Sequence, residues 1–213
     1  MDFKRLQEIV GKEPVFETGL LLAGQVDPAG VRRQLSRLTA SGRLIQLRRG
    51  LYALAPPFQK GRPHPFLVAN RMVRASYVSR QSALAYHGLI PEHVPVVTSV
   101  TTSRPGRWET PLGVFEYRHI KTDFFYGYGM FELVDEQAAL VATPEKALLD
   151  LLYLQPASAS SEYLKELRLQ NLERLDLEEL SRLAEKSGRP KLRRAARLLE
   201  KIARDEAKEY ESL

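Results

Sequence analysis

Arginine side chains recur along one predicted helix and again at the turn of the hairpin that follows it. The helix carries Arg32, Arg33 and Arg37 together with the polar residues Gln34 and Ser36. Guanidinium groups bind phosphate oxygens, and arginine or glutamine side chains can form paired hydrogen bonds with the edges of guanine or adenine. This chemistry is typical of a surface that recognises a nucleic acid, and it does not require a catalytic centre.

The hairpin is predicted from the segment RLIQLRRGLYAL, residues 43–54, with Arg48 and Arg49 at its tip. The apolar residues of both strands are expected to pack on the helices, and Gly50 supplies the positive φ that a tight turn requires. Both arginines are then predicted to point outward, as phosphate or minor-groove contacts. Arginines that only raise solubility, or that discourage pairing at a strand edge, are the alternative.

Local signals predict where the arginine-bearing helix begins, where it ends and which way it faces. Asp27 can accept hydrogen bonds from the free amides of the first turn, Pro28 suits the first helical position, and Gly42 closes the helix. On a helical wheel the cations point away from an apolar face. That face consists of Val31, Leu35 and Leu38. Gln34 lies near the boundary of the two faces, where a packing role is an alternative to base contact.

Two further helical segments are expected before this helix. In the first, Phe3, Leu6 and Val10 are three and four residues apart, which is the spacing of an amphipathic helix. Residues 16–24 are interpreted as a second short segment that ends at Gly24. Three helices followed at once by a hairpin match the winged helix-turn-helix, in which the last helix lies in the major groove of DNA and the hairpin touches the flanking backbone.

Positive charge is concentrated in the N-terminal half of the chain. The 213 residues carry a net charge of +6, and the stretch from Pro28 to Pro91 contains eleven Lys or Arg and no Asp or Glu. Taken alone, such a stretch is also compatible with a solvated surface kept for solubility. Combined with the predicted winged helix, it favours binding to double-stranded DNA.

Length and composition indicate two domains in a reducing compartment. A chain of 213 residues can bury two modest cores, and the absence of cysteine excludes both a disulfide framework and a thiolate zinc site. No stretch approaches the ~20 consecutive apolar residues that span a bilayer, and the N-terminus is unlike a signal peptide. We therefore expect a cytoplasmic protein without a membrane partner.

A proline-rich segment divides the chain. Residues 56–65 form the expected linker between a winged helix-turn-helix domain at 1–55 and a second domain at 66–213. Lys60 and Arg62 are secondary candidates for phosphate contacts as the linker leaves the hairpin. A linker that is merely solvated is the alternative.

The second domain is predicted to mix helices and strands. Two helices are expected first, separated near Ala75–Val78, with Ser79 as the cap of the second. Runs of β-branched and aromatic residues then predict strands, and a helix capped by Thr143 follows them. The segments concerned are strands within 94–103 and 112–120, a turn region at 104–111 and a hairpin at 131–142. The predicted class is α+β: a winged helix-turn-helix domain, then an α+β domain with a helical C-terminal tail.

The spacing of the leucines in the C-terminal tail predicts helices, and the last of these helices follows Pro190. Apolar residues form one stripe of that helix, and arginines and lysines occupy much of the rest. A second nucleic-acid surface is one interpretation. The favoured one is a surface helix that packs its stripe on the domain, with its cations balanced by nearby acids.

A metal-dependent nuclease or nucleotide-modifying enzyme, targeted by the winged helix, is the alternative class of function. No nucleophile elbow, phosphate-cradling loop or paired-histidine zinc motif is present. The histidines are His64, His87, His93 and His119, for which capping and packing roles are predicted. The scattered acids that could hold magnesium are Asp123, Glu132, Asp135 and Glu145. The sequence thus predicts no catalytic residue, no metal and no cofactor.

Residues 3–155 resemble the AbiEi-type antitoxins of type IV toxin–antitoxin and abortive-infection systems, which act in phage resistance. The segments that carry the resemblance are GRLIQLRRGLYAL, YVSRQSALAYHGL, PVVTSVTTSRPGR and ATPEKALLDLLYL. The resemblance implies a transcriptional repressor that binds inverted repeats in its own promoter. It also implies that the protein counteracts a cognate nucleotidyltransferase-type toxin without a stable complex.

The resemblance carries the DNA-binding role only onto positions that match the winged helix. These are Arg32, Arg33, Ser36, Arg37, Arg48 and Arg49. It supplies no residues for toxin neutralisation, and it leaves the role of residues 156–213 open. Paired repeats would suit two copies bound cooperatively. A repressor with no toxin partner is a further alternative.

Overall fold

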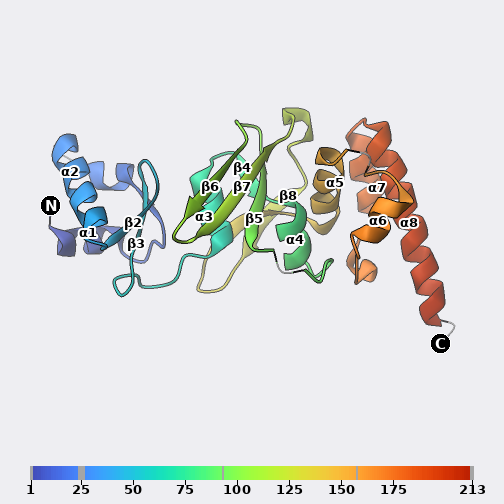
Figure 1. Ribbon diagram of the computed structural model, residues 1–213, viewed down its shortest axis with the longest axis horizontal. Helices are drawn as coiled ribbons and strands as arrows, with labels where there is room; N and C mark the ends of the chain where they lie inside the picture. The colour runs from blue at the N-terminus through green and yellow to red at the C-terminus, as the bar shows by residue number, and fades with distance from the viewer. Residues whose placement is uncertain (1, 24–26, 93, 157, 212–213) are drawn as a thin grey trace.

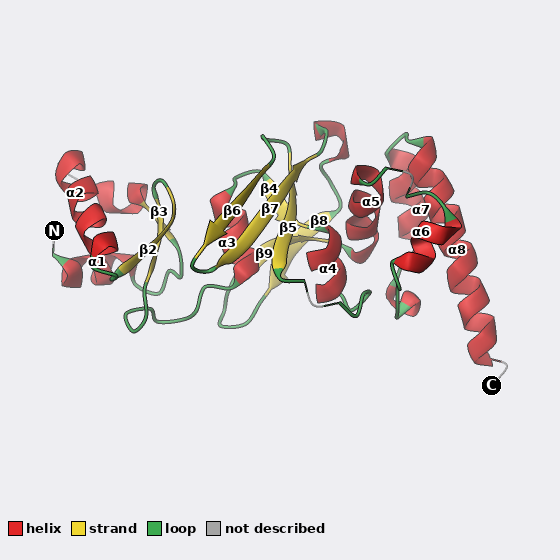
Figure 2. Ribbon diagram, viewed as in Figure 1, coloured by secondary structure: helices red, strands yellow, loops and turns green. Residues whose placement is uncertain are grey.

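The computed structural model describes residues 2–23, 27–92, 94–156 and 158–211. Three regions follow one another along an elongated molecule, with the two termini at opposite ends (Figure 1). The winged-helix region occupies one end, a large sheet the middle and a group of helices the other end (Figure 2). The predicted α+β class is confirmed.

The winged-helix region contains two α-helices, a 3-10 helix and a small sheet. Its elements are α1 (Phe3–Val10), β1 (Phe16–Glu17), η1 (Thr18–Leu22), α2 (Pro28–Ala40), β2 (Leu44–Arg48) and β3 (Leu51–Leu54), and the sheet order is β1-β3-β2. The prediction of one helical segment over residues 16–24 was wrong at its start, because Phe16 and Glu17 pair with the hairpin strand β3. Gly24, the expected end of that segment, lies outside the described residues.

The core of this region is made by the faces that the periodicity assigns to the interior. All three residues of the predicted apolar face of α2 are buried, and Leu6 and Val10 of α1 meet them from the other side. The buried members of the cluster are Leu6, Val10, Phe16, Leu21, Val31, Leu35, Leu38, Leu44, Tyr52 and Leu54. Because this face is buried, the opposite face of α2 is presented to solvent.

Asp27 caps α2 as predicted, since its carboxylate accepts hydrogen bonds from the backbone N–H groups of Ala29 at 2.9 Å and Gly30 at 2.8 Å. Replacing Asp27 by alanine leaves these amides without a side-chain acceptor. We expect the free energy of unfolding to fall by about 1 kcal/mol, measured by urea denaturation. Asp27→Asn is the matched control, because asparagine caps about as well as aspartate. Equal destabilisation by both substitutions would contradict a capping role.

The middle region is a six-stranded mixed sheet in the order β6-β7-β5-β4-β9-β8. The strands are β4 (Ser76–Val78), β5 (Val96–Thr101), β6 (Gly106–Thr110), β7 (Gly113–His119), β8 (Tyr128–Glu132) and β9 (Ala138–Ala142). The strand predictions for β5 and β7 and the hairpin β8–β9 are confirmed. Two expectations were wrong: β6 forms within the supposed turn region at 104–111, and β4 is a central strand where only a break between helices was expected.

Three helices pack on this sheet: α3 (Pro65–Met72), α4 (Arg80–Tyr86) and α5 (Pro144–Leu154). Thr143 caps α5 as predicted, and its hydroxyl accepts from the backbone N–H of Lys146 at 3.3 Å. Ser79 precedes α4 but does not cap it, because its hydroxyl donates instead to the buried Asp150 at 2.7 Å. The short 3-10 helix η2 (Thr122–Phe124) lies between β7 and β8.

The C-terminal region adds α6 (Ser161–Glu166), η3 (Leu172–Arg174), α7 (Leu177–Lys186) and α8 (Pro190–Glu211). The apolar stripe of α8 packs on α5 and α7, which confirms the packing that the favoured interpretation predicted for the last helix. Its buried residues are Leu192, Ala195, Ala196 and Leu199.

A charged pair lies entirely inside the sheet region. Lys146 and Asp150, one turn apart on α5, are both fully buried and contact each other. Asp150 also accepts hydrogen bonds from the hydroxyls of Tyr77 at 3.0 Å and Ser79 at 2.7 Å, both from the β4 segment. The Lys146 ammonium lies 3.6 Å from the ring centroid of Phe124. Burial lowers the pKa of Lys146 and raises that of Asp150, while each charge opposes the shift of the other.

Candidate nucleic-acid interface

The exposed face of α2 carries the cations that the sequence assigned to it. Arg32, Arg33, Ser36 and Arg37 are exposed, and Gln34 is half-buried at the boundary of the two faces. The helix therefore presents three guanidinium groups within two turns, on the side opposite its packed leucines. A side chain needs this orientation to reach a phosphate or a base edge.

These cations are available to an external anion. Arg33 approaches the Asp27 carboxylate at 3.6 Å, but the two side chains are 72% and 63% exposed, so water and salt screen the pair. Among the residues that the structure describes, no ion pair joins Arg32 or Arg37 to a carboxylate. A DNA phosphate that binds this face of α2 would thus replace only water and the weak contact between Arg33 and Asp27.

The hairpin tip differs from the prediction, because its two arginines do not share an orientation. Gly50 adopts the expected positive φ of 81°, and Arg49 is exposed. Arg48 turns inward: its side chain is 33% exposed, and its guanidinium donates to the backbone carbonyl oxygens of Arg49 at 3.2 Å and Arg71 at 3.4 Å. The expectation that both point outward was therefore wrong for Arg48. The β2–β3 pairing is irregular between Gln46 and Arg48, which ends the regular alternation of side chains before the turn.

Arg48 belongs to a contact between the hairpin and the sheet region. The hairpin lies between the first two α-helices and the large sheet (Figure 1). Val15, Leu47 and Leu51 are buried in the hydrophobic cluster of the sheet region, not in that of the winged helix. Glu17 adds an ion pair with Arg74 at 2.7 Å and approaches Arg48 at 4.0 Å. This contact fixes the hairpin against the sheet.

Residues 17–55 match the family model AbiEi_4, described as a transcriptional regulator, AbiEi antitoxin. Residues 17–55, here called the AbiEi segment, are similar to that family. The family predicted from the sequence is thus confirmed over the part that contains α2 and the hairpin. No curated protein matches the chain.

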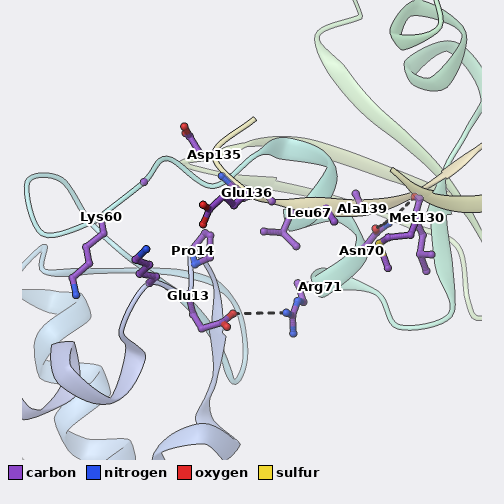
Figure 3. A pocket seen from close by; sticks show the side chains of 15 residues that line it. Glu13, Pro14, Lys60, Leu67, Asn70, Arg71, Met130, Asp135, Glu136 and Ala139 are labelled. Atoms are coloured by element: carbon purple, nitrogen blue, oxygen red, sulfur yellow. Dashed lines mark hydrogen bonds and ion pairs between the residues drawn. The ribbon is translucent and has the colours of Figure 1, made fainter. Parts of the chain in front are cut away.

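The AbiEi segment contains seven of the nine candidate contact residues, and the other two lie in the linker that follows it. Lys60 and Arg62 have exposed side chains. Lys60 borders a hollow of about 910 Å³ between the winged-helix region and the sheet, where Glu13 pairs with Arg71 at 3.8 Å (Figure 3). Acidic side chains, Asp135 and Glu136 among them, also line this hollow, so its charge is mixed.

The eleven cations between Pro28 and Pro91 divide into two groups. Acids from outside the stretch pair with five of them: Arg33, Arg48, Arg71, Arg74 and Arg80. Within the described part of the chain, no ion pair is found for the other six, which are Arg32, Arg37, Arg43, Arg49, Lys60 and Arg62. All six lie in the AbiEi segment or the linker after it. The unpaired positive charge is therefore concentrated beside α2 and the hairpin.

The described histidines make local contacts, and His64 has the capping role predicted for it. His64 accepts a hydrogen bond from the backbone N–H of Phe66 at 3.1 Å at the start of α3, and His87 contacts the carbonyl oxygen of Ala142 at 2.8 Å. Burial lowers the pKa of both rings. His119 contacts the carbonyl oxygen of Ser103 at 3.1 Å, and His93 lies outside the described residues.

The candidate magnesium ligands do not converge. In the described ranges, no three His, Asp or Glu side chains lie close enough to hold a metal ion. Asp123 instead pairs with Arg189 at 3.2 Å, and Glu145 accepts from the backbone N–H of Asp176 at 3.0 Å. Among the same residues, no helix combines the length and the apolar character needed to cross a membrane.

Proposed function

We propose that this protein is a transcriptional autorepressor that binds inverted repeats in the promoter of its own operon. The observation that carries the proposal is the cationic face of α2, exposed and only weakly paired, within a segment that matches the AbiEi regulators. The α2 side chains act in the major groove, and Arg49 contacts the backbone beside it. Arg32, Arg33, Ser36 and Arg37 are the principal contacts, and Gln34, Lys60 and Arg62 are secondary ones.

The second part of the proposal is antitoxin activity. The matched family is described as an antitoxin, and the resemblance of residues 3–155 adds a nucleotidyltransferase-type toxin that is counteracted without a stable complex. We assign this activity to a domain at 66–213, joined by the linker 56–65 to a DNA-binding domain at 1–55. The protein acts in the cytoplasm and is not an enzyme.

Footprinting on the DNA upstream of the protein's own reading frame tests the repressor role. We expect protection of paired repeats whose centres lie about one helical turn, or a multiple of it, apart. No protection of a repeated sequence would contradict the proposal.

Co-expression with the neighbouring reading frame tests the antitoxin role. The product of that reading frame should arrest growth when it is expressed alone, and it should not do so when this protein is expressed with it. If the product of the neighbouring reading frame does not arrest growth, the antitoxin role is contradicted and the protein is a repressor without a toxin partner.

The two arginines of the hairpin turn are expected to respond differently to substitution. Arg49→Ala should lower DNA affinity about eightfold at 0.1 M salt. One phosphate contact raises the logarithm of affinity by roughly 0.9 for each tenfold decrease in salt concentration, and 0.1 M lies one such step below 1 M. The melting temperature of this variant should equal that of wild type. Arg48→Ala should lower the melting temperature instead, since it removes a contact with the sheet region. Electrophoretic mobility shifts and thermal unfolding check both variants; a stable Arg48→Ala protein with the greater loss of affinity would contradict the assignment.

A further inference from the structure

A hollow of about 430 Å³ lies where the sheet region meets the C-terminal helices. Residues of α4, β5, α5 and α6 line it, together with the loop before β5. The apolar part of the wall includes Leu84, Ile90, Val94, Leu151 and Leu167. Sites for small molecules usually have a volume of about 300–1,000 Å³ and combine apolar walls with a few polar groups. The hollow therefore has the size and the lining of a small-molecule site.

Two neighbouring polar side chains of this wall have buried atoms without partners. They are Arg80 and Gln81, the first two residues of α4. Among the residues that the structure describes, neither the Nε of Arg80 nor the Oε1 of Gln81 has a hydrogen-bond partner. Burial of a polar group without a partner is unfavourable, and native proteins keep few such groups. The wall thus contains one spare donor and one spare acceptor on adjacent residues.

The backbone of Arg80 is strained, although its guanidinium is held in place. Arg80 has a φ of 58°, a left-handed conformation that is uncommon for residues other than glycine. Its Nη1 donates to the Oε1 of Glu116 at 2.8 Å, and the two side chains are only 13% and 20% exposed. Strained residues of this kind persist where the surrounding structure enforces them, and they cluster at functional sites. The fold therefore holds Arg80 in the wall at a conformational cost.

The charged groups around the hollow favour an uncharged ligand. Three carboxylates and two guanidinium groups border it, so the lining carries a net negative charge: Glu92, Glu116, Glu166, Arg80 and Arg107. Both arginines already have acidic partners, and Arg107 pairs with Glu109 at 3.6 Å. A phosphate is therefore disfavoured. The spare donor and acceptor require a ligand that offers one acceptor and one donor, and an amide offers both.

We infer that this hollow binds a small uncharged molecule with a cyclic amide edge, such as the base of uridine or guanosine. The ligand carbonyl accepts from the Nε of Arg80, and the ring N–H donates to the Oε1 of Gln81. Both protein atoms are buried, so binding requires these two side chains to turn toward the ligand. The apolar wall covers the faces of the ring. Because residues of α4 and α6 share the hollow, a bound ligand links the sheet region to the C-terminal helices.

Isothermal titration calorimetry of the full-length protein with nucleosides tests the inference. Uridine or guanosine should bind and should raise the melting temperature of the protein. Their methylated forms, 3-methyluridine and 1-methylguanosine, lack the ring N–H, so we expect at least about tenfold weaker binding. The 5′-monophosphates should also bind more weakly than the nucleosides, because carboxylates border the hollow.

The variant Gln81→Met separates ligand binding from folding. Methionine removes the amide oxygen, so no acceptor is left buried without a partner. Affinity for the nucleoside should fall at least about tenfold, whereas the melting temperature of the free protein should equal or exceed that of wild type. The matched control is Gln46→Met, which replaces an exposed glutamine of β2 in the winged-helix region. It should bind the nucleoside as wild type does.

Four results would overturn the inference, and none of them depends on DNA binding. The first is failure of both uridine and guanosine to bind. The second is equal or tighter binding of the methylated forms or of the monophosphates. The third is an equal loss of affinity in Gln81→Met and Gln46→Met, or no loss in either. The fourth is a lower melting temperature of Gln81→Met, which would assign Gln81 to the packing of the protein and not to a ligand.

Discussion

Replacing Lys146 by methionine is expected to destabilise the protein by about 3–5 kcal/mol, because it leaves the Asp150 carboxylate buried without its counter-charge. Neither side chain has any exposure, so water cannot replace the lost partner. The hydroxyls of Tyr77 and Ser79 still donate to Asp150. These two hydrogen bonds reduce the loss of stability but do not neutralise the charge of the Asp150 carboxylate. Chemical denaturation of the variant and of wild type measures the difference.

A double variant separates the uncompensated charge from lost packing around Lys146. In Lys146→Met/Asp150→Asn no charge is buried, and the asparagine oxygen can still accept from the two hydroxyls. This protein should be more stable than the single variant Lys146→Met. If the double variant is the less stable of the two, the pair does not act as a charge pair. Lys165→Met, on an exposed lysine, should change the free energy of unfolding by less than about 0.5 kcal/mol.

The helices α2 and α5 could be predicted from the sequence because the signals that determine them are local. The cap at Asp27, the proline at the first position and the leucine spacing placed α2 and its exposed cations correctly. Thr143 and Pro144 did the same for α5. In both helices the residues that determine the start and the buried face lie within a few positions of one another, so neighbouring sequence is sufficient.

The strand β4 and the orientation of Arg48 could not be predicted from the sequence, because their partners come from distant parts of the chain. The strand β4 has three residues, too few for a pattern, and it exists because β5 and β9 pair with it on both sides. Arg48 was expected to face outward, but residues far along the chain set its position: the carbonyl of Arg71 and the apolar contact made by Leu47. The acids Glu13 and Glu17, just before the basic stretch, were the available signal that some of its cations pair internally.

The internal pairs explain why the acid-free stretch overstates the charge available to DNA. Its cations nearest the sheet pair with acids that lie outside it, Glu17 and Glu116 among them. The pairs Glu13–Arg71 and Glu17–Arg74 join the winged-helix region to the sheet region, whereas in the described part of the chain Arg32, Arg37 and Arg49 form no ion pair. The same stretch of sequence thus contributes to two surfaces, one between regions and one facing solvent.

Replacing both Arg33 and Arg37 by alanine should abolish most operator binding. We expect affinity to fall about 100-fold or more, since each substitution removes a contact worth about 1–3 kcal/mol when it reads a base edge. If both contact phosphates instead, the salt slope should decrease by about 1.8 and binding to all sequences should weaken alike. Titration of operator and unrelated duplexes at several salt concentrations distinguishes the two. The fold should be retained, because both side chains are exposed.

The control for this prediction is Arg194→Ala/Arg197→Ala, which removes the same charge from the exposed side of α8. Its operator affinity should stay close to that of wild type, because the cations of α8 lie in the C-terminal helical region at the far end of the molecule (Figure 1). Equal losses in the two double variants would show that DNA responds to overall charge and not to the face of α2. Loss of binding only with Arg33 and Arg37 would assign recognition to that face, since net charge is the same in both proteins.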